Sequence, residues 1–380
     1  MSWEEIVSKV SRESETQIKE VIDTFPYLPQ LAKSLRESKV KVINGIEKYI
    51  DISIKSVEKL GGKAFLAKDT NEAQKIIDEL VGENKTVVLS KTNVAIELKL
   101  REFLKERHNE VWETDLGEFL LQISDNWPSH ILNPALGLTK EEAARAVSRI
   151  DSSINENSSV NDIVVSVRKF LMTKYLQADI GITGANAIAA EMGSALLVEN
   201  EGNIRIDTVL PETHIVVTGI DKIVPTVLDA INEVLVQAAY AGSLPPTYIN
   251  VTSGPSSTED LEQVRVSPAT GPKKFILILV DNGRLVASKD ENLRDALLCI
   301  RCGRCYFSCP VYRVLGKNWI GTKSPYNGPM GVMWNYITNK DPWPASYCTH
   351  SGGCKEVCPM EIDIPSVIEY IKSIGSKSLI

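Results

Sequence analysis

Residues 299–310 read CIRCGRCYFSCP: four cysteines at x2, x2 and x3 spacings, with a proline directly after the last. Four thiols within eleven residues and a final Cys-Pro are typical of the bacterial ferredoxin loop that holds a [4Fe–4S] cluster. A structural zinc site usually places its second pair of ligands a dozen or more residues further along. All seven cysteines lie in the last 82 residues. The pattern therefore predicts an electron-carrying C-terminal domain behind a cysteine-free body.

A second group, Cys348-x5-Cys354-x3-Cys358-Pro359, ends in the same dipeptide. In two-cluster ferredoxins, the cysteine before the proline ligates the cluster of the other group. This rule assigns to one cluster, called cluster one here, the thiols of Cys299, Cys302, Cys305 and Cys358. The other, cluster two, keeps the thiols of Cys309, Cys348 and Cys354. We therefore expect two iron–sulfur clusters with interleaved ligands.

Cluster two is one thiolate short. Ser351 stands where the spacing Cys-x2-Cys-x3-Cys-Pro would place a cysteine, and His350 is its neighbour. Three outcomes are open: a [3Fe–4S] cluster, a [4Fe–4S] cluster with an oxygen, imidazole or water ligand, or a ligand from a partner protein. A single cluster with a partly structural second group is the remaining alternative. Ser351 and His350 are therefore the candidates for an eighth ligand.

Composition limits the class of protein. The 380 residues are 43% hydrophobic and 24% charged, which is ordinary for a globular protein. The net charge of −7 argues against a nucleic-acid binder, which usually carries a basic face. No apolar run approaches the roughly 20 residues that span a bilayer, and the opening MSWEEIVSKV is no secretory signal. We expect a cytoplasmic protein without a membrane span, peripheral to a membrane only through a partner.

The body alternates between strand and helix patterns. Residues 1–60 have apolar side chains at helical spacing and predict helices that pack on the body. Strands are expected at 64–67, 86–90, 111–114, 180–183, 194–198, 214–218 and 275–280. Helices are expected at 71–81, capped by Thr70, and at 93–107 and 224–240. Such alternation favours an α/β domain with a mostly parallel sheet.

Three segments of the body carry candidate polar sites. Ser90-Lys91-Thr92-Asn93 follows a strand, and helix capping is favoured there over anion binding. Glycines at 181–202 permit tight turns beside Glu191 and Glu201, which could line a cleft. His214 alone favours a structural role. The sequence holds no Gly-x-Gly-x-x-Gly, no P-loop and no Gly-x-Ser-x-Gly, so no nicotinamide, nucleotide or hydrolase signature is present.

The body resembles the LUD domain of the lactate-utilisation protein B family. The resemblance rests on ADIGITG at 178–184, NEGN at 200–203, LPETH at 210–214, GIDKIVP at 219–225 and YNGPMG at 326–331. It implies an α/β fold similar to sugar isomerases and CoA transferases, followed by a mainly α-helical ferredoxin-like domain. The expected boundaries are 1–60 for the N-terminal helices, 61–285 for the LUD domain and 286–380 for the cluster domain. That family usually has a cysteine at the position of Ser351, and Cys348 stands three residues earlier instead.

The resemblance also implies a function. It predicts an electron-transfer subunit of a complex that oxidises L-lactate, or a related 2-hydroxy acid, to the 2-oxo acid. The expected partners are a flavoprotein dehydrogenase, a cysteine-rich redox subunit, or both. Two alternatives are a CoA-transferase-like enzyme that uses Glu191 or Glu201, and a redox-sensing interaction protein.

Two further expectations concern individual side chains. A ligand in the body would be bound near Ser90, Lys91, Glu191 and Arg205, because charged residues and glycine turns lie near the strand ends. Trp319, Trp334 and Trp343, between the cysteine groups, are expected to pack around the clusters and exclude water.

Overall fold

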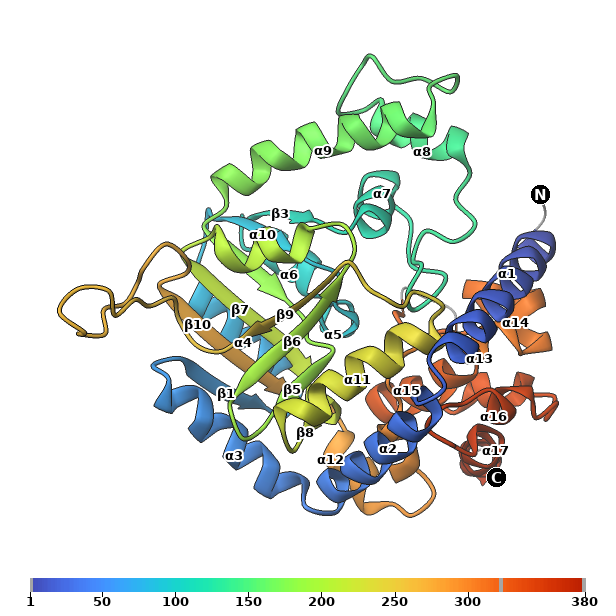
Figure 1. Ribbon diagram of the computed structural model, residues 1–380. Helices are drawn as coiled ribbons and strands as arrows, with labels where there is room; N and C mark the ends of the chain where they lie inside the picture. The colour runs from blue at the N-terminus through green and yellow to red at the C-terminus, as the bar shows by residue number, and fades with distance from the viewer. Residues whose placement is uncertain (1–2, 321–323, 378–380) are drawn as a thin grey trace.

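The computed structural model describes residues 3–320 and 324–377. Figure 1 shows an α/β body, a helical C-terminal part drawn in orange and red, and blue N-terminal helices that run along both. Among the described residues, no helix combines the length and the apolar character that a membrane crossing needs.

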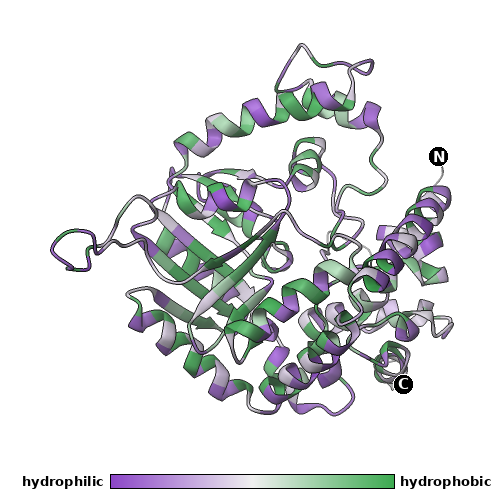
Figure 2. Cartoon of the chain, in the orientation of Figure 1, coloured by the Kyte–Doolittle hydropathy of each residue, from purple (hydrophilic) through white to green (hydrophobic). Residues whose placement is uncertain are grey.

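A six-stranded sheet forms the centre of the body, in the order β1-β10-β7-β4-β2-β3. All of its pairings are parallel, as expected from the sequence. Its strands are β1 (Lys63–Ala67), β2 (Thr86–Leu89), β3 (Glu110–Glu113), β4 (Ile180–Thr183), β7 (Thr213–Gly219) and β10 (Lys274–Val280). Figure 2 shows these strands mostly in the hydrophobic colour. Their residues are apolar because a parallel sheet is buried on both faces.

The two faces of this sheet pack against different layers. On β10, Ile276 and Ile278 share a core with α4 (Thr70–Val81), α5 (Asn93–Glu97) and α6 (Leu100–Glu106). The alternate residues Phe275 and Leu277 share another core with α3 (Ile46–Lys59) and the second sheet. This alternation follows from the two-residue period of a strand.

A second, four-stranded sheet has the order β8-β5-β6-β9. Its strands are β5 (Ala187–Ala189), β6 (Ser194–Glu199), β8 (Ile223–Val224) and β9 (Tyr248–Thr252). The neighbouring helices are α10 (Asn203–Val209), α11 (Val227–Tyr240) and α2 (Leu28–Asn44), and a separate core joins α7 (Leu116–Ser124), α8 (Lys140–Val147) and α9 (Val160–Gln177). The sequence predicts β6 and α11 but neither the second sheet nor α7–α9.

The C-terminal part is a chain of short helices. They are α12 (Arg284–Lys289), η2 (Arg294–Leu298), α13 (Arg304–Phe307), α14 (Pro310–Leu315), η3 (Gly316–Asn318), α15 (Gly328–Asn339), η4 (Trp343–Tyr347), α16 (Gly353–Glu356) and α17 (Ile364–Lys377). The first helix, α1 (Trp3–Thr24), packs here as well as on the body, since the Trp3 indole nitrogen donates to the Tyr312 carbonyl oxygen at 3.2 Å. Val7 and Leu28 join the same core as Tyr306.

Three local predictions were wrong. The expected helix 93–107 is broken, because Lys99 adopts a left-handed conformation with φ of 51° between α5 and α6. The cap of α4 is Asp69, whose carboxylate accepts the backbone N–H of Glu72, and Thr70 is the first helical residue. The helix expected from 224 begins at Val227, because residues 223–224 pair with β5 as a strand.

Candidate iron–sulfur centres and the adjacent cavity

The two cysteine groups fold as two copies of one motif. The five-residue 3₁₀ helices η2 and η4 end directly before Cys299 and Cys348. Each loop then holds two residues with positive φ, Arg301 and Gly303 in the first and His350 and Gly352 in the second, and continues into a four-residue helix, α13 or α16. The correspondence aligns Ser351 with Cys302.

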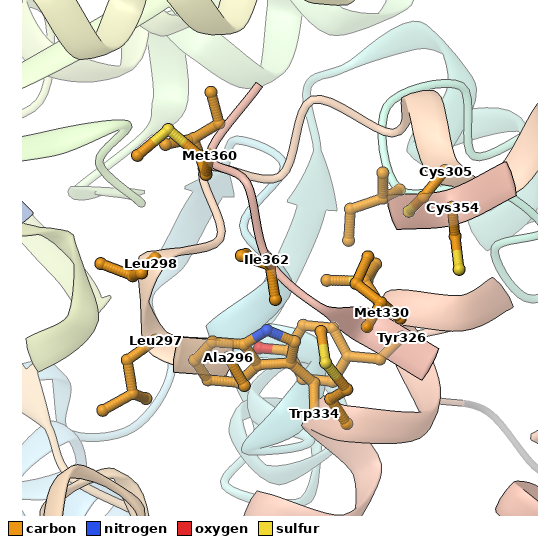
Figure 3. Close-up of a cluster of buried hydrophobic side chains, with 14 of the residues drawn as sticks. Ala296, Leu297, Leu298, Cys305, Tyr326, Met330, Trp334, Cys354, Met360 and Ile362 are labelled. Atoms are coloured by element: carbon orange, nitrogen blue, oxygen red, sulfur yellow. The ribbon is translucent and has the colours of Figure 1, made fainter. Parts of the chain in front are cut away.

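The thiols gather in two pockets that follow the interleaved assignment. The cysteines of the first pocket are Cys299, Cys302, Cys305 and Cys358. Apart from Arg304, its other walls are apolar and include Met330 and Ile362, which Figure 3 shows in the surrounding core. The cysteines of the second pocket are Cys309, Cys348 and Cys354, with His350 and Ser351 in the same lining. The seven cysteines are unpaired, and no disulfide competes for them.

The donor set and its environment fit iron–sulfur clusters. Among the described residues, no three His, Cys, Asp or Glu side chains stand close enough to hold one metal ion, whereas a cluster of several irons sets its thiolates wider apart. Burial raises the pKa of the Cys354 thiol to about 12, and it also raises the pKa of Cys305. Thiolates in such apolar pockets need bound cations, which the irons of a cluster supply.

The two pockets differ in exposure. In the first loop, Ile300 and Arg301 are buried against the body. In the second loop, Thr349, His350 and Ser351 are exposed. The first cysteine pocket therefore lies inside the protein beside the body, and the second lies under a surface loop.

The tryptophans divide in the same way. Trp334 and Trp319 are 0% and 2% exposed, as expected for side chains that exclude water. Trp343 is 63% exposed, so the expectation that it packs around a cluster was wrong. It lies in η4, directly before the exposed loop of cluster two.

The two candidates for an eighth ligand, His350 and Ser351, differ in their contacts. The His350 Nε2 lies 2.8 Å from the Glu369 carboxylate, so Nε2 is occupied and Nδ1 is the ring nitrogen left for a metal. The Ser351 side chain makes no hydrogen bond among the described residues and occupies the position of Cys302 in the repeated motif. The repeat therefore favours Ser351.

We expect Ser351→Cys to complete a four-thiolate site in cluster two. An iron without a thiolate ligand has one protein bond fewer and should leave first on oxidation. Air-exposed variant protein should therefore give a weaker three-iron EPR signal than the wild type. Thr349→Cys, an exposed neighbour out of register, is the control, and equal signals in the wild type and the Ser351 variant would contradict the alignment.

A buried charge network connects the cluster-one loop to the body. Arg301 is 4% exposed; its Nη1 donates to the Cys299 carbonyl oxygen at 2.6 Å and its Nη2 to Asp221 at 3.0 Å. Asp221 also accepts from Arg284 Nε at 2.6 Å, and Arg284 Nη2 donates to Glu97 at 2.8 Å. The Arg301 guanidinium stacks on the Trp334 ring at 3.7 Å. These contacts fix the loop on the α/β body.

A cavity of about 370 Å³ lies at the carboxyl ends of β2 and β4. Residues 91–94 after β2 and 184–186 after β4 line it. These two strands are neighbours, but the next strand of the sheet after β2 is β3, on one side, and the next after β4 is β7, on the other side. The cavity therefore lies at the point where the strand order reverses, called the switch point, and open α/β sheets bind ligands at such a point. Arg301 and Tyr326 form part of its wall. The cavity therefore borders the loop that carries Cys299 and Cys302.

The structure does not bring the four candidate ligand-binding residues together. Lys91 lines the cavity, and Ser90 is fully buried beside it, with a hydroxyl that has no hydrogen-bond partner in the described residues. Glu191 lies outside the lining, where it is exposed and accepts the Val227 backbone N–H at 2.9 Å. Arg205 is also outside, exposed and stacked 4.5 Å from the Tyr248 ring centre.

The other singled-out polar residues are structural. Thr92 directly precedes α5, but its side chain makes no hydrogen bond that caps this helix. The capping interpretation of this segment was therefore wrong, and the Thr92 hydroxyl donates instead to the Val217 carbonyl oxygen. Glu201 lines the cavity and accepts the Leu116 backbone N–H at 3.0 Å. His214 is fully buried and hydrogen-bonded to Thr183 at 2.9 Å.

Several residues of the cavity wall were not predicted from the sequence. Asn133, Lys222 and Tyr326 come from segments far apart in the chain. Lys222 and Tyr326 lie in two of the segments that carry the family resemblance, 219–225 and 326–331, and those segments were the available signal. Arg301 had a usable signal, because it stands between two cluster cysteines.

Comparisons with known proteins agree with this architecture. A LUD domain model matches residues 50–280, and a 4Fe-4S dicluster domain model matches residues 295–362. A protein of Shouchella clausii named Lactate utilization protein B is 37% identical over 89% of this chain and 70% of its own length. The Bacillus subtilis protein of the same name is 35% identical over 87% of this chain and 68% of its own.

A solved structure of a DUF162 family protein from Deinococcus radiodurans covers 63% of this chain and 98% of its own. It is 17% identical and gives a TM-score of 0.33, too low to support an inference. The two domain matches and the full-length relatives do identify the family. With an α/β LUD domain followed by a 4Fe-4S dicluster domain, this chain belongs to the lactate utilization protein B family.

Proposed function

We propose that this chain is an iron–sulfur electron-relay subunit that serves the oxidation of L-lactate, or a related 2-hydroxy acid, to the 2-oxo acid. Its relatives are named for lactate utilization, which supports this substrate class. Oxidising a hydroxy acid releases two electrons, and two bound clusters would carry one each.

The observation that carries the proposal is the different environment of the two cysteine pockets. The first pocket is walled by apolar side chains and borders the cavity of the body through Arg301. The second lies under an exposed loop beside Trp343. Such an arrangement suits electron entry on the side of the body and exit at the surface.

The protein residues have separable roles in this relay. Met330 and Ile362 exclude water from the first pocket, while Trp319 and Ile368 close the second. Arg301 positions the cluster-one loop through its bond to the Cys299 carbonyl. The chain would receive or pass electrons through a flavoprotein dehydrogenase, a cysteine-rich redox subunit, or both.

The proposal is tested on anaerobically purified protein by EPR before and after dithionite, with iron and acid-labile sulfide counts. We expect a brown protein whose reduced form shows two interacting clusters. A colourless protein, or one that contains zinc and no sulfide, would exclude a relay. Acyl exchange by protein freed of clusters would instead favour the CoA-transferase alternative.

A further inference from the structure

The cavity at the switch point is lined by a lysine, Lys91, that no carboxylate of the described residues contacts. The Lys91 Nζ donates to the Leu132 carbonyl oxygen at 2.6 Å. Among the described residues, no Asp or Glu oxygen lies within 4.0 Å of it, although Asp115, Glu118 and Glu201 are near enough to oppose the lowering of its pKa by burial. An ammonium has three donors, and two of those of Lys91 have no partner among the described residues.

Three acidic side chains of the lining, Asp115, Glu199 and Glu201, already accept backbone N–H groups, and Asp221 is paired with arginine side chains. Asp115 caps α7 by accepting the Glu118 N–H at 3.1 Å. Glu199 accepts the N–H groups of Ile204 and Arg205 at 2.7 and 3.0 Å. These bonds hold the carboxylates at the start of α7 and α10 and away from Lys91.

Two side-chain amides in the same lining also have unused hydrogen-bonding groups. Asn93 lies two residues after Lys91, at the start of α5, and Asn133 follows Leu132, whose carbonyl accepts from Lys91. Neither amide side chain makes a hydrogen bond among the described residues, and Asn133 is exposed to solvent, so the donors and acceptors of both are available to a ligand in the cavity that they line. Lys91, Asn93 and Asn133, which come from two segments of the chain, therefore line the same cavity.

The charge of the lining restricts the ligand. It contains the carboxylates of Asp115, Glu199, Glu201 and Asp221, which would repel a dianion such as phosphate. Lys222 pairs with Glu233 at 3.6 Å, and Arg301 pairs with Asp221 at 3.0 Å. Among the described residues of the lining, Lys91 is therefore the cation without a contacting carboxylate. A ligand that carries one negative charge and a neutral oxygen beside it matches the one lysine and the two amides.

We infer that this cavity binds a small monocarboxylate that carries an oxygen on its second carbon. Lys91 binds the carboxylate, and Asn93 and Asn133 bind the neutral oxygen. The choice of 2-hydroxy and 2-oxo acids rests on the proposed function, whereas the site itself rests on the geometry. The cavity volume lies within the range of about 300–1,000 Å³ that is usual for small-molecule sites.

The test is isothermal titration calorimetry on the cluster-loaded protein with L-lactate, pyruvate, propionate and inorganic phosphate. We expect saturable binding of lactate or pyruvate, weaker binding of propionate, and none of phosphate. Lys91→Met should weaken lactate or pyruvate binding at least tenfold, because it removes a charge-assisted hydrogen bond. Lys85→Met is the matched control, since Lys85 precedes the same strand at its opposite end and pairs with Asp179.

Iron content and circular dichroism check that both variants are folded. Tighter binding of phosphate than of the carboxylates, no binding by the wild type, or equal binding by the Lys91 variant would each overturn the inference. The cluster measurements described above use no carboxylate. A failed relay and an empty cavity are therefore separate results.

Discussion

Cys358→Ser is expected to abolish cluster one and leave cluster two, although Cys358 belongs to the second cysteine group. Its thiol lies in the pocket of Cys299, Cys302 and Cys305. Reciprocally, Cys309→Ser should abolish cluster two, because Cys309 shares a pocket with Cys348 and Cys354. Each variant should lose about half of the bound iron.

Iron content alone does not identify which cluster is lost, so two reference variants are needed. Cys302→Ser and Cys348→Ser each remove a ligand whose pocket agrees with its own sequence group. The reduced EPR spectrum of the Cys358 variant should match that of the Cys302 variant, and the spectrum of the Cys309 variant that of the Cys348 variant. The opposite matches would show that each group holds its own cluster.

The grouping of the cysteines in two pockets could be predicted because its signal is local. The spacing of seven cysteines and two prolines within 61 residues, 299–359, defines both loops, and the structure repeats one backbone motif around each. The parallel sheet was also predictable, since its strands are short apolar runs between helical patterns. Cysteine spacing and strand patterns can be read without knowing which distant segments of the chain contact one another in the fold.

The cavity and the charge network could not be predicted, because they depend on strand order. Lys91 becomes a cavity residue only because β4 inserts beside β2, a pairing between segments about ninety residues apart. Arg301 meets Asp221 across 80 residues, and Arg284 meets Glu97 across 187. Lone charged residues normally indicate a solvated surface, so sequence gives no reason to pair these.

Asp221→Asn is expected to lower the free energy of unfolding by about 3–5 kcal/mol, the usual cost of removing one partner from a buried ion pair. Asp221 is 4% exposed and accepts from both Arg284 and Arg301. The asparagine keeps the shape but leaves the buried guanidinium groups with one negative charge fewer. The measurement is the midpoint of urea unfolding under anaerobic conditions, monitored by circular dichroism. Asp78→Asn is the control, because its pair with Arg107 is partly exposed to solvent and should contribute less than the buried pairs of Asp221.

The effect should also depend on pH with a defined sign. Burial alone would raise the pKa of Asp221, but Arg301 and Arg284, followed by Lys222 and Lys39, outweigh burial and hold it below its usual range. A carboxyl group with a depressed folded-state pKa contributes stability above its unfolded pKa of about 3.9 and loses it as the pH falls further. The difference between wild type and variant should therefore be constant from about pH 7 to 5 and shrink below about pH 4. A difference that grows on acidification, or a variant as stable as the Asp78 control, would mean that Asp221 does not hold the cluster-one loop on the body by its charge.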